Sequence, residues 1–299
     1  MSTIITYDHC ICCGSAAISK VFTCKDNTVS KQLFEIWKCD NCTLRFTQHV
    51  PDEELIGAYY RSADYVSHTD TKKGLINTLY HRVRNYTVNS KRDLIKKVTG
   101  LKQGVLLDVG AGTGAFANVM HQSGWHVTGL EPDETARTNA LNAYQLQLGE
   151  LKNLHQLPAQ TYDAITLWHV LEHVHELHNY LEKFFEILKP AGRLIIAVPN
   201  YCSFDAEYYN NCWAAYDVPR HLYHFSPKSM QLLLEQKGFY IEAHKPMWFD
   251  SFYVSMLSEK DKNGKNNFMR AFWVGLKSNM KAFADTKKCS SITYIVRKK

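Results

Sequence analysis

The chain has 299 residues, of which 45% are hydrophobic and 21% are charged. These values exclude an intrinsically disordered chain, and the length fits one large domain with a small appendage. No apolar run approaches the ~18 residues of a membrane span, and the segment Met1–Cys10 lacks the basic and apolar regions of a signal peptide. We therefore expect a cytoplasmic protein without a transmembrane segment. The net charge of +6 is scattered along the chain, so nucleic acid is not an expected partner.

The first 50 residues hold six of the nine cysteines. An odd total without a secretion signal disfavours a disulfide framework and favours metal ligation. The pairs Cys10/Cys13 and Cys39/Cys42 are separated by 39 − 13 − 1 = 25 residues, and such pairs are typical of a tetrahedral four-thiolate zinc site. All four ligands would come from protein, so the predicted Zn²⁺ is structural. Cys12 adds a third thiol and leaves the choice of ligands open. This segment predicts a small zinc-ribbon-like module.

The next segment, residues 51–100, has the periodicity of helices at Pro51–Tyr60 and Lys72–Thr99. Strands and helices alternate over the remaining domain, 101–299. The predicted strands are Val105–Val109, His126–Glu131, Gln145–Leu148, Ala164–Trp168, Arg193–Val198, Phe239–Lys245 and Ser291–Arg297. The predicted helices are Gly114–Ser123, Asp133–Asn142, Leu177–Leu188 and Lys228–Lys237, with two more at 249–285, around a break at Lys262–Asn267. This order predicts an α/β fold with a mainly parallel, seven-stranded sheet and helices on both faces.

A glycine-rich turn follows the first predicted strand of this sheet. Asp108 precedes the sequence Gly110-Ala111-Gly112-Thr113-Gly114, which opens a helix. Glycines let the backbone approach a ligand closely, and helix N-terminal N–H groups face it. A second acid, Glu131, ends the next strand and lies 131 − 114 = 17 residues past the third glycine. A carboxylate there can accept both hydroxyls of a ribose. These features alone fit a nicotinamide-dependent oxidoreductase as well as a methyltransferase.

Two downstream segments distinguish these alternatives. Tyr162–Val174 resembles the fourth-strand motif of class I S-adenosylmethionine-dependent methyltransferases, and Leu188–Leu194 resembles the turn that follows in the same family, with Ala191 in place of a glycine. The resemblance implies a Rossmann-like methyltransferase fold with S-adenosyl-L-methionine as cofactor. It covers about residues 104–200.

Carried over position by position, the resemblance implies a cofactor site. Asp108 and the backbone of Gly110–Gly114 would hold the methionine part, and Glu131, followed by Pro132, would hold the ribose. Glu150, which replaces an aspartate of the family, would lie near adenine. Trp168 and His169 would flank the transferred methyl group.

Two more segments extend the resemblance to a bacterial branch of these methyltransferases that has a four-cysteine N-terminal module. They are Tyr59–His68 and Asp217–Pro227. Tyr60 and Tyr65, in the helical linker, would close over the cofactor as a lid. The second segment belongs to an aromatic substrate loop, 200–226, which follows the fifth strand.

Ligands of open α/β sheets bind outside the carboxyl ends of the strands, so the substrate loop would lie near the methyl donor. His221 is the preferred general base, with His224 and Tyr216 as competitors, because imidazole takes a proton near neutral pH. Arg220 would hold an anionic group of the substrate. The histidines could instead only hold the loop in shape.

The predicted reaction is O- or C-methylation of a small or carrier-linked acceptor that the sequence leaves unidentified, as it does the oligomeric state. A non-catalytic partner protein that keeps the cofactor fold is the other alternative. The helix Asn267–Ala284 is basic and amphipathic, with Phe268, Phe272, Leu276 and Phe283 roughly on one face. We expect this face to pack onto the core rather than to contact a membrane.

Overall fold

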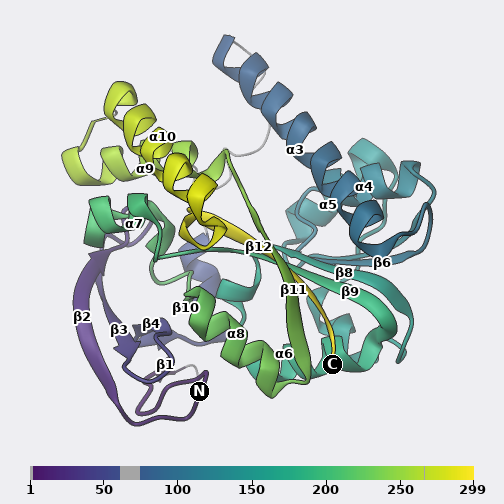
Figure 1. Cartoon of the computed structure of the whole chain (residues 1–299), viewed down its shortest axis with the longest axis horizontal. Coiled ribbons are helices and arrows are strands. Elements are labelled where there is room, and N and C mark those ends of the chain that lie inside the picture. The colour runs from purple at the N-terminus through teal and green to yellow at the C-terminus, as the bar shows by residue number, and fades with distance from the viewer. Residues whose placement is uncertain (1–2, 61–74, 266) are drawn as a thin grey trace.

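A six-stranded sheet lies at the centre of the computed structural model, which describes residues 3–60, 75–265 and 267–299 (Figure 1). The strand order is β11-β12-β9-β8-β6-β7, in which β6 to β9 are parallel and β12 runs antiparallel between β9 and β11. The strands are β6 (Val105–Val109), β7 (His126–Leu130), β8 (Tyr162–Trp168), β9 (Leu188–Pro199), β11 (Phe239–Pro246) and β12 (Ser291–Lys298). The predicted mainly parallel α/β fold is confirmed.

Helices cover both faces of this sheet because the strand residues alternate between two cores. Leu106 and Ile195 pack with α3 and α4, whereas Leu107 and Leu194 pack with α6 and α8. In Figure 1 the helices α3, α4 and α5 lie together on one side of the sheet, with α6 and α8 on the other. These helices are α3 (Leu75–Thr99), α4 (Ala115–Gln122), α5 (Glu134–Tyr144), α6 (Leu177–Ile187) and α8 (Pro227–Gln236). Each lies within a few residues of its predicted range.

The predicted third strand, Gln145–Leu148, is reduced to a single parallel bridge between Leu130 and Gly149. Helix α5 ends only at Tyr144, and Gln145 takes a left-handed conformation with φ 55° to cap it. Too few residues are then left for a strand. The seventh strand position of the sheet is therefore held by the backbone of Gly149.

The N-terminal segment forms a separate antiparallel sheet that a distant part of the chain completes. Its order is β10-β4-β3-β2. Strands β2 (Ile18–Lys25), β3 (Leu33–Cys39) and β4 (Arg45–Gln48) are consecutive, but β10 (Tyr223–His224) comes from the predicted substrate loop. A short antiparallel pair is formed by β1 (Ile4–Ile5) and β5 (Val50–Pro51). The short helices α1 (Glu53–Ile56) and η1 (Gly57–Tyr60) come directly after β5. The substrate loop is thus fixed to the N-terminal segment by backbone pairing.

The substrate loop and the connections of the sheet are built of short helical turns. They are η2 (Leu151–Gln156), η3 (Leu171–His173), α7 (Phe204–Tyr209), η4 (Asn210–Cys212), η5 (Ala214–Tyr216) and η6 (Thr286–Lys288).

The two helices predicted at 249–285 are present as α9 (Asp250–Asn263) and α10 (Phe268–Ala284). The expectation for the large side chains of α10 was wrong: Phe268, Phe272 and Phe283 are 61%, 52% and 86% exposed. The helix instead buries small residues, and a Cβ at Gly275 would lie 3.0 Å from the Phe252 Cα of α9. Because α9 and α10 approach closely, only the face of α10 that carries small residues fits between them. Among the described residues, no helix is long and apolar enough to cross a membrane.

Candidate functional site

The glycine turn after β6 is open on the side where a ligand would approach. Gly110, Gly112 and Gly114 all have positive φ, at 68°, 55° and 77°, which favours glycine over other residues. A Cβ at Gly110 would lie 2.4 Å from Val170, and one at Gly114 would lie 2.9 Å from Ala140. At Gly112 it would meet nothing within 4 Å. Two glycines therefore serve internal packing, and the middle one leaves free space, as a bound cofactor would require.

Glu131 faces this turn from the end of β7. Its carboxylate accepts hydrogen bonds from the backbone N–H groups of Gly112 (2.7 Å) and Asp133 (3.0 Å). The N–H of Ala111 donates to the Leu130 carbonyl and joins the two strand ends. Burial raises the pKa of Glu131. The predicted ribose ligand is thus held in place at the turn by backbone groups, and Pro132 directly after it is exposed.

Asp108 lies under the turn and is almost completely buried. Thr166 donates a hydrogen bond of 2.7 Å to its carboxylate, and burial raises the pKa of Asp108 to about 7 against that bond and the charge of Lys91. Burial in turn lowers the pKa of Lys91, on α3, to about 8. This lysine was absent from our sequence-based candidates.

Trp168 and His169 end β8 beside the glycine turn. The Lys91 ammonium lies 4.2 Å from the centroid of the Trp168 ring. The indole N–H of Trp168 is buried without a hydrogen-bond partner among the described residues. An orphaned donor of this kind fits a site that receives a polar ligand.

His169 is held between two carboxylates. Its Nε2 is 3.1 Å from Asp250 Oδ2, and its Nδ1 is 3.5 Å from Glu172 Oε1. Burial alone would lower the pKa of His169, but the hydrogen bonds and charges of these two acids raise it to about 10. The residue is therefore a cation at neutral pH and can donate protons but not accept one. Asp250, at the start of α9, was also missed by the sequence reasoning.

Two further imidazoles follow next to Glu172. The ring centroids of His173 and His221 are 4.6 Å apart. His173 Nδ1 is 3.0 Å from both the Arg220 carbonyl and the Tyr60 hydroxyl, and His221 Nδ1 is 2.8 Å from the Ala215 carbonyl. A carbonyl only accepts, so each Nδ1 carries a proton and Nε2 is the ring atom left to take or give one; that of His221 lies 3.9 Å from Asp217 Oδ2. Burial lowers the pKa of His173 to about 4. One ligand atom each from Glu172, His173 and His221 lies within 4.8 Å of the others, which would also suit a metal ion.

Three other residues of the substrate loop point into the protein. Arg220 is 1% exposed and binds the carboxylates of Asp217 and Asp26 and the Tyr59 carbonyl. The expectation that Arg220 holds a substrate anion is wrong, since its guanidinium is committed to these partners.

The two competitors of His221 are equally enclosed. His224 Nε2 lies 3.1 Å from Thr47 Oγ1, and the Tyr216 hydroxyl accepts a hydrogen bond of 2.6 Å from Arg45. Burial lowers the pKa of His224 well below its usual value and raises that of Tyr216. Both residues join the loop to β4, as expected if they only hold the loop in shape.

The last cofactor candidate, Glu150, lies at the surface after the Leu130–Gly149 bridge. Its carboxylate pairs with Lys152 at 2.6 Å, and this pairing lowers its pKa. Tyr65 lies outside the described residues.

The four predicted zinc ligands meet at one place. The sulfur atoms of Cys10, Cys13, Cys39 and Cys42 all lie within 4.8 Å of one another, with pairs at 3.4 and 3.5 Å. Zn–S bonds of about 2.3 Å in a tetrahedron place sulfurs about 3.8 Å apart, so the group fits zinc. Cys12 is not one of these four, and its thiol contacts the Ser229 carbonyl of α8 at 3.6 Å.

A surface pocket with a volume of about 470 Å³ lies at the turn between α9 and α10, away from these residues. The positive φ angles, the open space at Gly112 and the buried acids are found at the glycine turn, which makes that turn the candidate cofactor site.

Class I methyltransferases are defined by a Rossmann-like sheet with a glycine turn and a strand-end acid. They also carry a fourth-strand motif, which Tyr162–Val174 resembles. The comparisons with known proteins agree. Residues 80–244, more than half of the chain, match the family described as "Methyltransferase domain", and the chain belongs to this family. The predicted S-adenosylmethionine-dependent methyltransferase is thereby confirmed at the level of its class.

Two curated relatives are ubiquinone biosynthesis O-methyltransferases. The chain is 26% identical over 173 residues to the human mitochondrial ubiquinone biosynthesis O-methyltransferase, covering 52% of this chain and 46% of the relative. It is 32% identical over 115 residues to the Vibrio cholerae ubiquinone biosynthesis O-methyltransferase, covering 36% and 46%. The chain thus spans about half the length of the curated relatives it matches.

Among solved structures, the magnesium protoporphyrin IX methyltransferase of Synechocystis PCC 6803, determined with bound S-adenosylhomocysteine, has a TM-score of 0.55. It shares 15% identity, and the match covers 83% of this chain and 100% of that one. At this identity the likeness concerns the fold.

Proposed function

We propose that this protein methylates a small or carrier-linked molecule at oxygen or carbon, with S-adenosylmethionine bound at the glycine turn. The observation that carries the proposal is the open space at Gly112 beside Glu131. The names of the relatives favour a hydroxyl oxygen as acceptor. A cytoplasmic location stays a prediction from the sequence.

Within this proposal the cofactor contacts are those expected from the sequence, with one addition. Glu131 holds the ribose, Asp108 and the turn hold the methionine part, and Glu150 lies near adenine. Lys91 is added because its ammonium is buried between Asp108 and Trp168. There it would balance the charge of the carboxylate in the methionine part of the cofactor. S-adenosylmethionine supplies an electrophilic methyl group to this site.

His221 is the proposed base. Its Nδ1–H is committed to the Ala215 carbonyl, which leaves Nε2 to take the proton of a hydroxyl or an acidic carbon. His224 and Tyr216 are set aside because their polar atoms bind Thr47 and Arg45. His169 is set aside because its raised pKa keeps it protonated.

We also propose three functional parts of the chain. Residues 1–50 form the zinc module, 51–100 the linker and lid, and 101–299 the methyltransferase domain. A structural zinc held by Cys10, Cys13, Cys39 and Cys42 would fix the sheet to which β10 is paired. The zinc module would then shape the substrate loop rather than act on the substrate.

The proposal is tested by calorimetric titration with S-adenosylmethionine and with NAD(H), followed by transfer of labelled methyl groups to fractions of a cell extract. We expect micromolar binding of S-adenosylmethionine and one or more labelled small products. Binding of NAD(H) alone would favour the oxidoreductase. Tight cofactor binding without transfer to any fraction would favour the non-catalytic partner.

A further inference from the structure

Helix α10 divides its surface into three strips. At about 100° per residue, the buried small residues occupy one strip and three cations, Arg270, Lys277 and Lys281, another. The third strip spans about 140° of the helix circumference, and we call it the apolar strip. Its apolar members are Phe268, Met269, Phe272, Trp273, Leu276, Met280 and Phe283, and Asn279 is the one polar residue among them.

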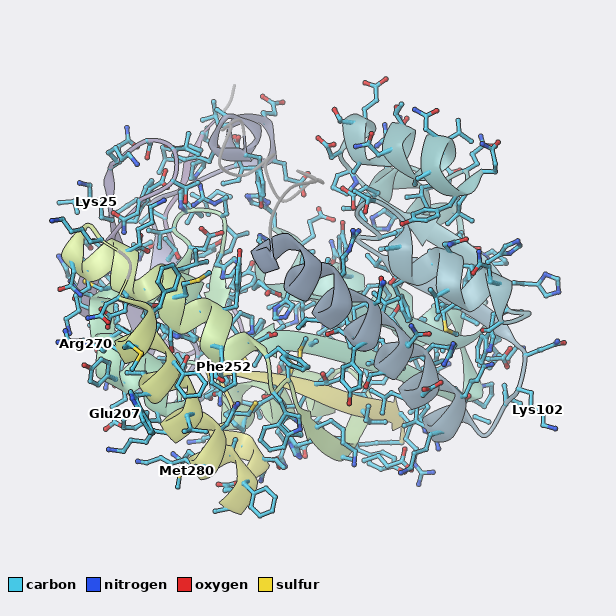
Figure 2. All side chains as sticks on the ribbon, turned by 90° about the horizontal axis from the view of Figure 1, so that it is seen from above. Lys25, Lys102, Glu207, Phe252, Arg270 and Met280 are labelled. Atoms are coloured by element: carbon cyan, nitrogen blue, oxygen red, sulfur yellow. The ribbon has the colours of Figure 1, made fainter. Side chains whose placement is uncertain are left out.

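The apolar strip faces away from the protein. Met269, Trp273 and Met280 are 71%, 60% and 66% exposed, and Phe268, Phe272 and Phe283 are exposed as well. Figure 2 shows α9 and α10 along one side of the molecule, with Arg270 and Met280 at its edge. Isolated exposed apolar residues are common on soluble proteins, but a continuous set of this size marks an interaction surface.

The surface continues beyond α10. Asn279 donates a hydrogen bond of 2.8 Å to the Trp248 carbonyl, which joins the C-terminal half of α10 to the start of α9. Trp248 and Phe249 are both exposed there, and the Phe249 ring contacts Tyr86 of α3. The apolar surface therefore extends from α10 to the segment that carries Asp250, the partner of His169.

The charge of α10 is purely positive. Between Phe268 and Ala284 there is no aspartate or glutamate, and at the helix ends the exposed cations Lys265, Lys287 and Lys288 outnumber the exposed C-cap acid Asp285. The Lys277 and Lys281 ammonium groups lie 4.8 and 5.0 Å from the centroid of the Phe204 ring. Both cations thus border the apolar strip on the side of α7.

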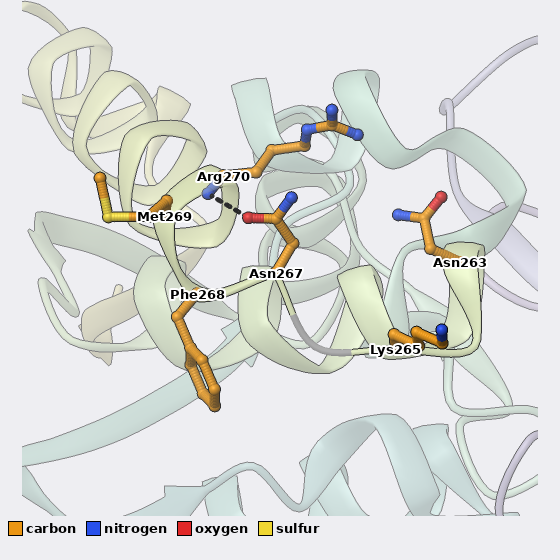
Figure 3. Close-up of a pocket in the computed structure, with 6 residues that line it drawn as sticks. All are labelled: Asn263, Lys265, Asn267, Phe268, Met269 and Arg270. Atoms are coloured by element: carbon orange, nitrogen blue, oxygen red, sulfur yellow. Dashed lines mark hydrogen bonds between the residues drawn. The ribbon is translucent and has the colours of Figure 1, made fainter.

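The pocket at the start of α10 combines the same two kinds of side chain. Figure 3 shows Phe268, Met269 and Arg270 pointing in three directions from the first turn of the helix. The pocket, of about 470 Å³, is lined by Asn263, Lys265, Asn267, Phe268, Met269 and Arg270. Cations beside exposed apolar groups match the headgroup and the first methylenes of an anionic lipid.

We propose that α10 binds anionic phospholipid membranes, lying in the plane of the interface with its apolar strip among the lipids. Basic helices with aromatic residues on one face and modest overall hydrophobicity bind in this way, and each surface cation adds attraction to anionic headgroups. This inference goes beyond the proposed function and does not depend on it.

A second copy of the chain fits the same face less well. A symmetric dimer through α10 would place this acid-free helix against itself, so that Arg270, Lys277 and Lys281 face cations of the other copy. Anionic lipid supplies the complementary charge that a copy of the helix lacks.

The test is co-sedimentation of the full chain with vesicles, either of phosphatidylcholine alone or of phosphatidylcholine with phosphatidylglycerol. We expect binding to the mixed vesicles, little to the neutral ones, and weakening by salt. The double variant Trp273→Ser/Phe283→Ser should lose most of the binding, and Lys277→Gln/Lys281→Gln should lose about fivefold for each lysine. A matched control is Leu33→Ser, an exposed leucine on β3, which should bind as the wild type does.

Calorimetry with S-adenosylmethionine separates this inference from the proposed function, since cofactor affinity should stay unchanged in the α10 variants. Equal binding by wild type and Trp273→Ser/Phe283→Ser, or no binding to either vesicle, would overturn the proposal. A wild-type dimer that becomes monomeric in this variant without any vesicle binding would assign the face to a second copy and overturn it as well.

Discussion

His169 and Asp250 connect the end of β8 to the start of α9 through a contact of 3.1 Å between Nε2 and Oδ2. The two residues are 81 positions apart (250 − 169), and they lie where the candidate active site meets helix α9. The protonated state of His169 depends on this contact, because burial lowers the His169 pKa and Asp250 raises it.

This contact predicts a pH dependence of stability. The pKa of His169 is raised from 6.5 to about 10 on folding, so its stabilisation is fully present below pH 6.5 and is lost as the pH rises through about 10. In Asp250→Asn the His169 pKa should fall, and the loss should begin at lower pH. NMR titration of the His169 ring and denaturant unfolding across this range measure both effects. Asp93→Asn, an exposed acid paired with Arg92, serves as the control; an unchanged His169 titration in Asp250→Asn would contradict the assignment.

Glu131→Ala should weaken S-adenosylmethionine binding by about 2–3 kcal/mol, since a charge-assisted hydrogen bond contributes roughly 1.5–3 kcal/mol. Calorimetric titration measures the affinity. The conservative Glu131→Gln should lose less, because an amide oxygen still accepts the Gly112 N–H. Unchanged affinity in Glu131→Ala would mean that the ribose lies elsewhere.

The four-cysteine group should bind about one zinc per chain, measured by elemental analysis. Cys39→Ser should lose the metal and lower the melting temperature. Cys12→Ser is the matched control, since the Cys12 thiol contacts the Ser229 carbonyl and is not one of the four clustered sulfurs, and it should keep the zinc. Metal-free wild-type protein with the same stability would remove zinc from the proposal.

His221→Ala should lower kcat about 10²–10⁴-fold and leave cofactor affinity nearly intact. Steady-state kinetics with an acceptor found in the extract screen, together with calorimetry, separate the two effects. His126→Ala, at an exposed position on β7, should keep the wild-type kcat. A His221 variant that also keeps it would leave this residue with a structural role in the loop.

The pattern of the sequence predicted the strands of the sheet and the glycine turn because both are local. Val105–Val109 alternates between two cores, and the glycines stand directly behind it. Lys91 and Asp250 could not be found in this way, since tertiary packing brings α3 and α9 to the strand ends and no short motif marks either residue.

The orientation of α10 was mispredicted for a different reason. The helix has two faces able to pack, one of small residues around Gly275 and one of large ones around Phe272. Periodicity locates a face but does not tell which of the two is buried. Here the short distance to Phe252 selects the small one.

The pairing of β10 with β4 has a consequence for synthesis. Tyr223 follows Gln48, the last residue of β4, by 175 positions (223 − 48). The N-terminal strands leave the ribosome long before their final partner, so the outer edge of β4 has unpaired N–H and C=O groups while most of the chain is still being made. A second nascent chain could pair with this edge in that interval. The exposed edge of β4 is therefore a site for mispairing between chains until the substrate loop has been synthesised.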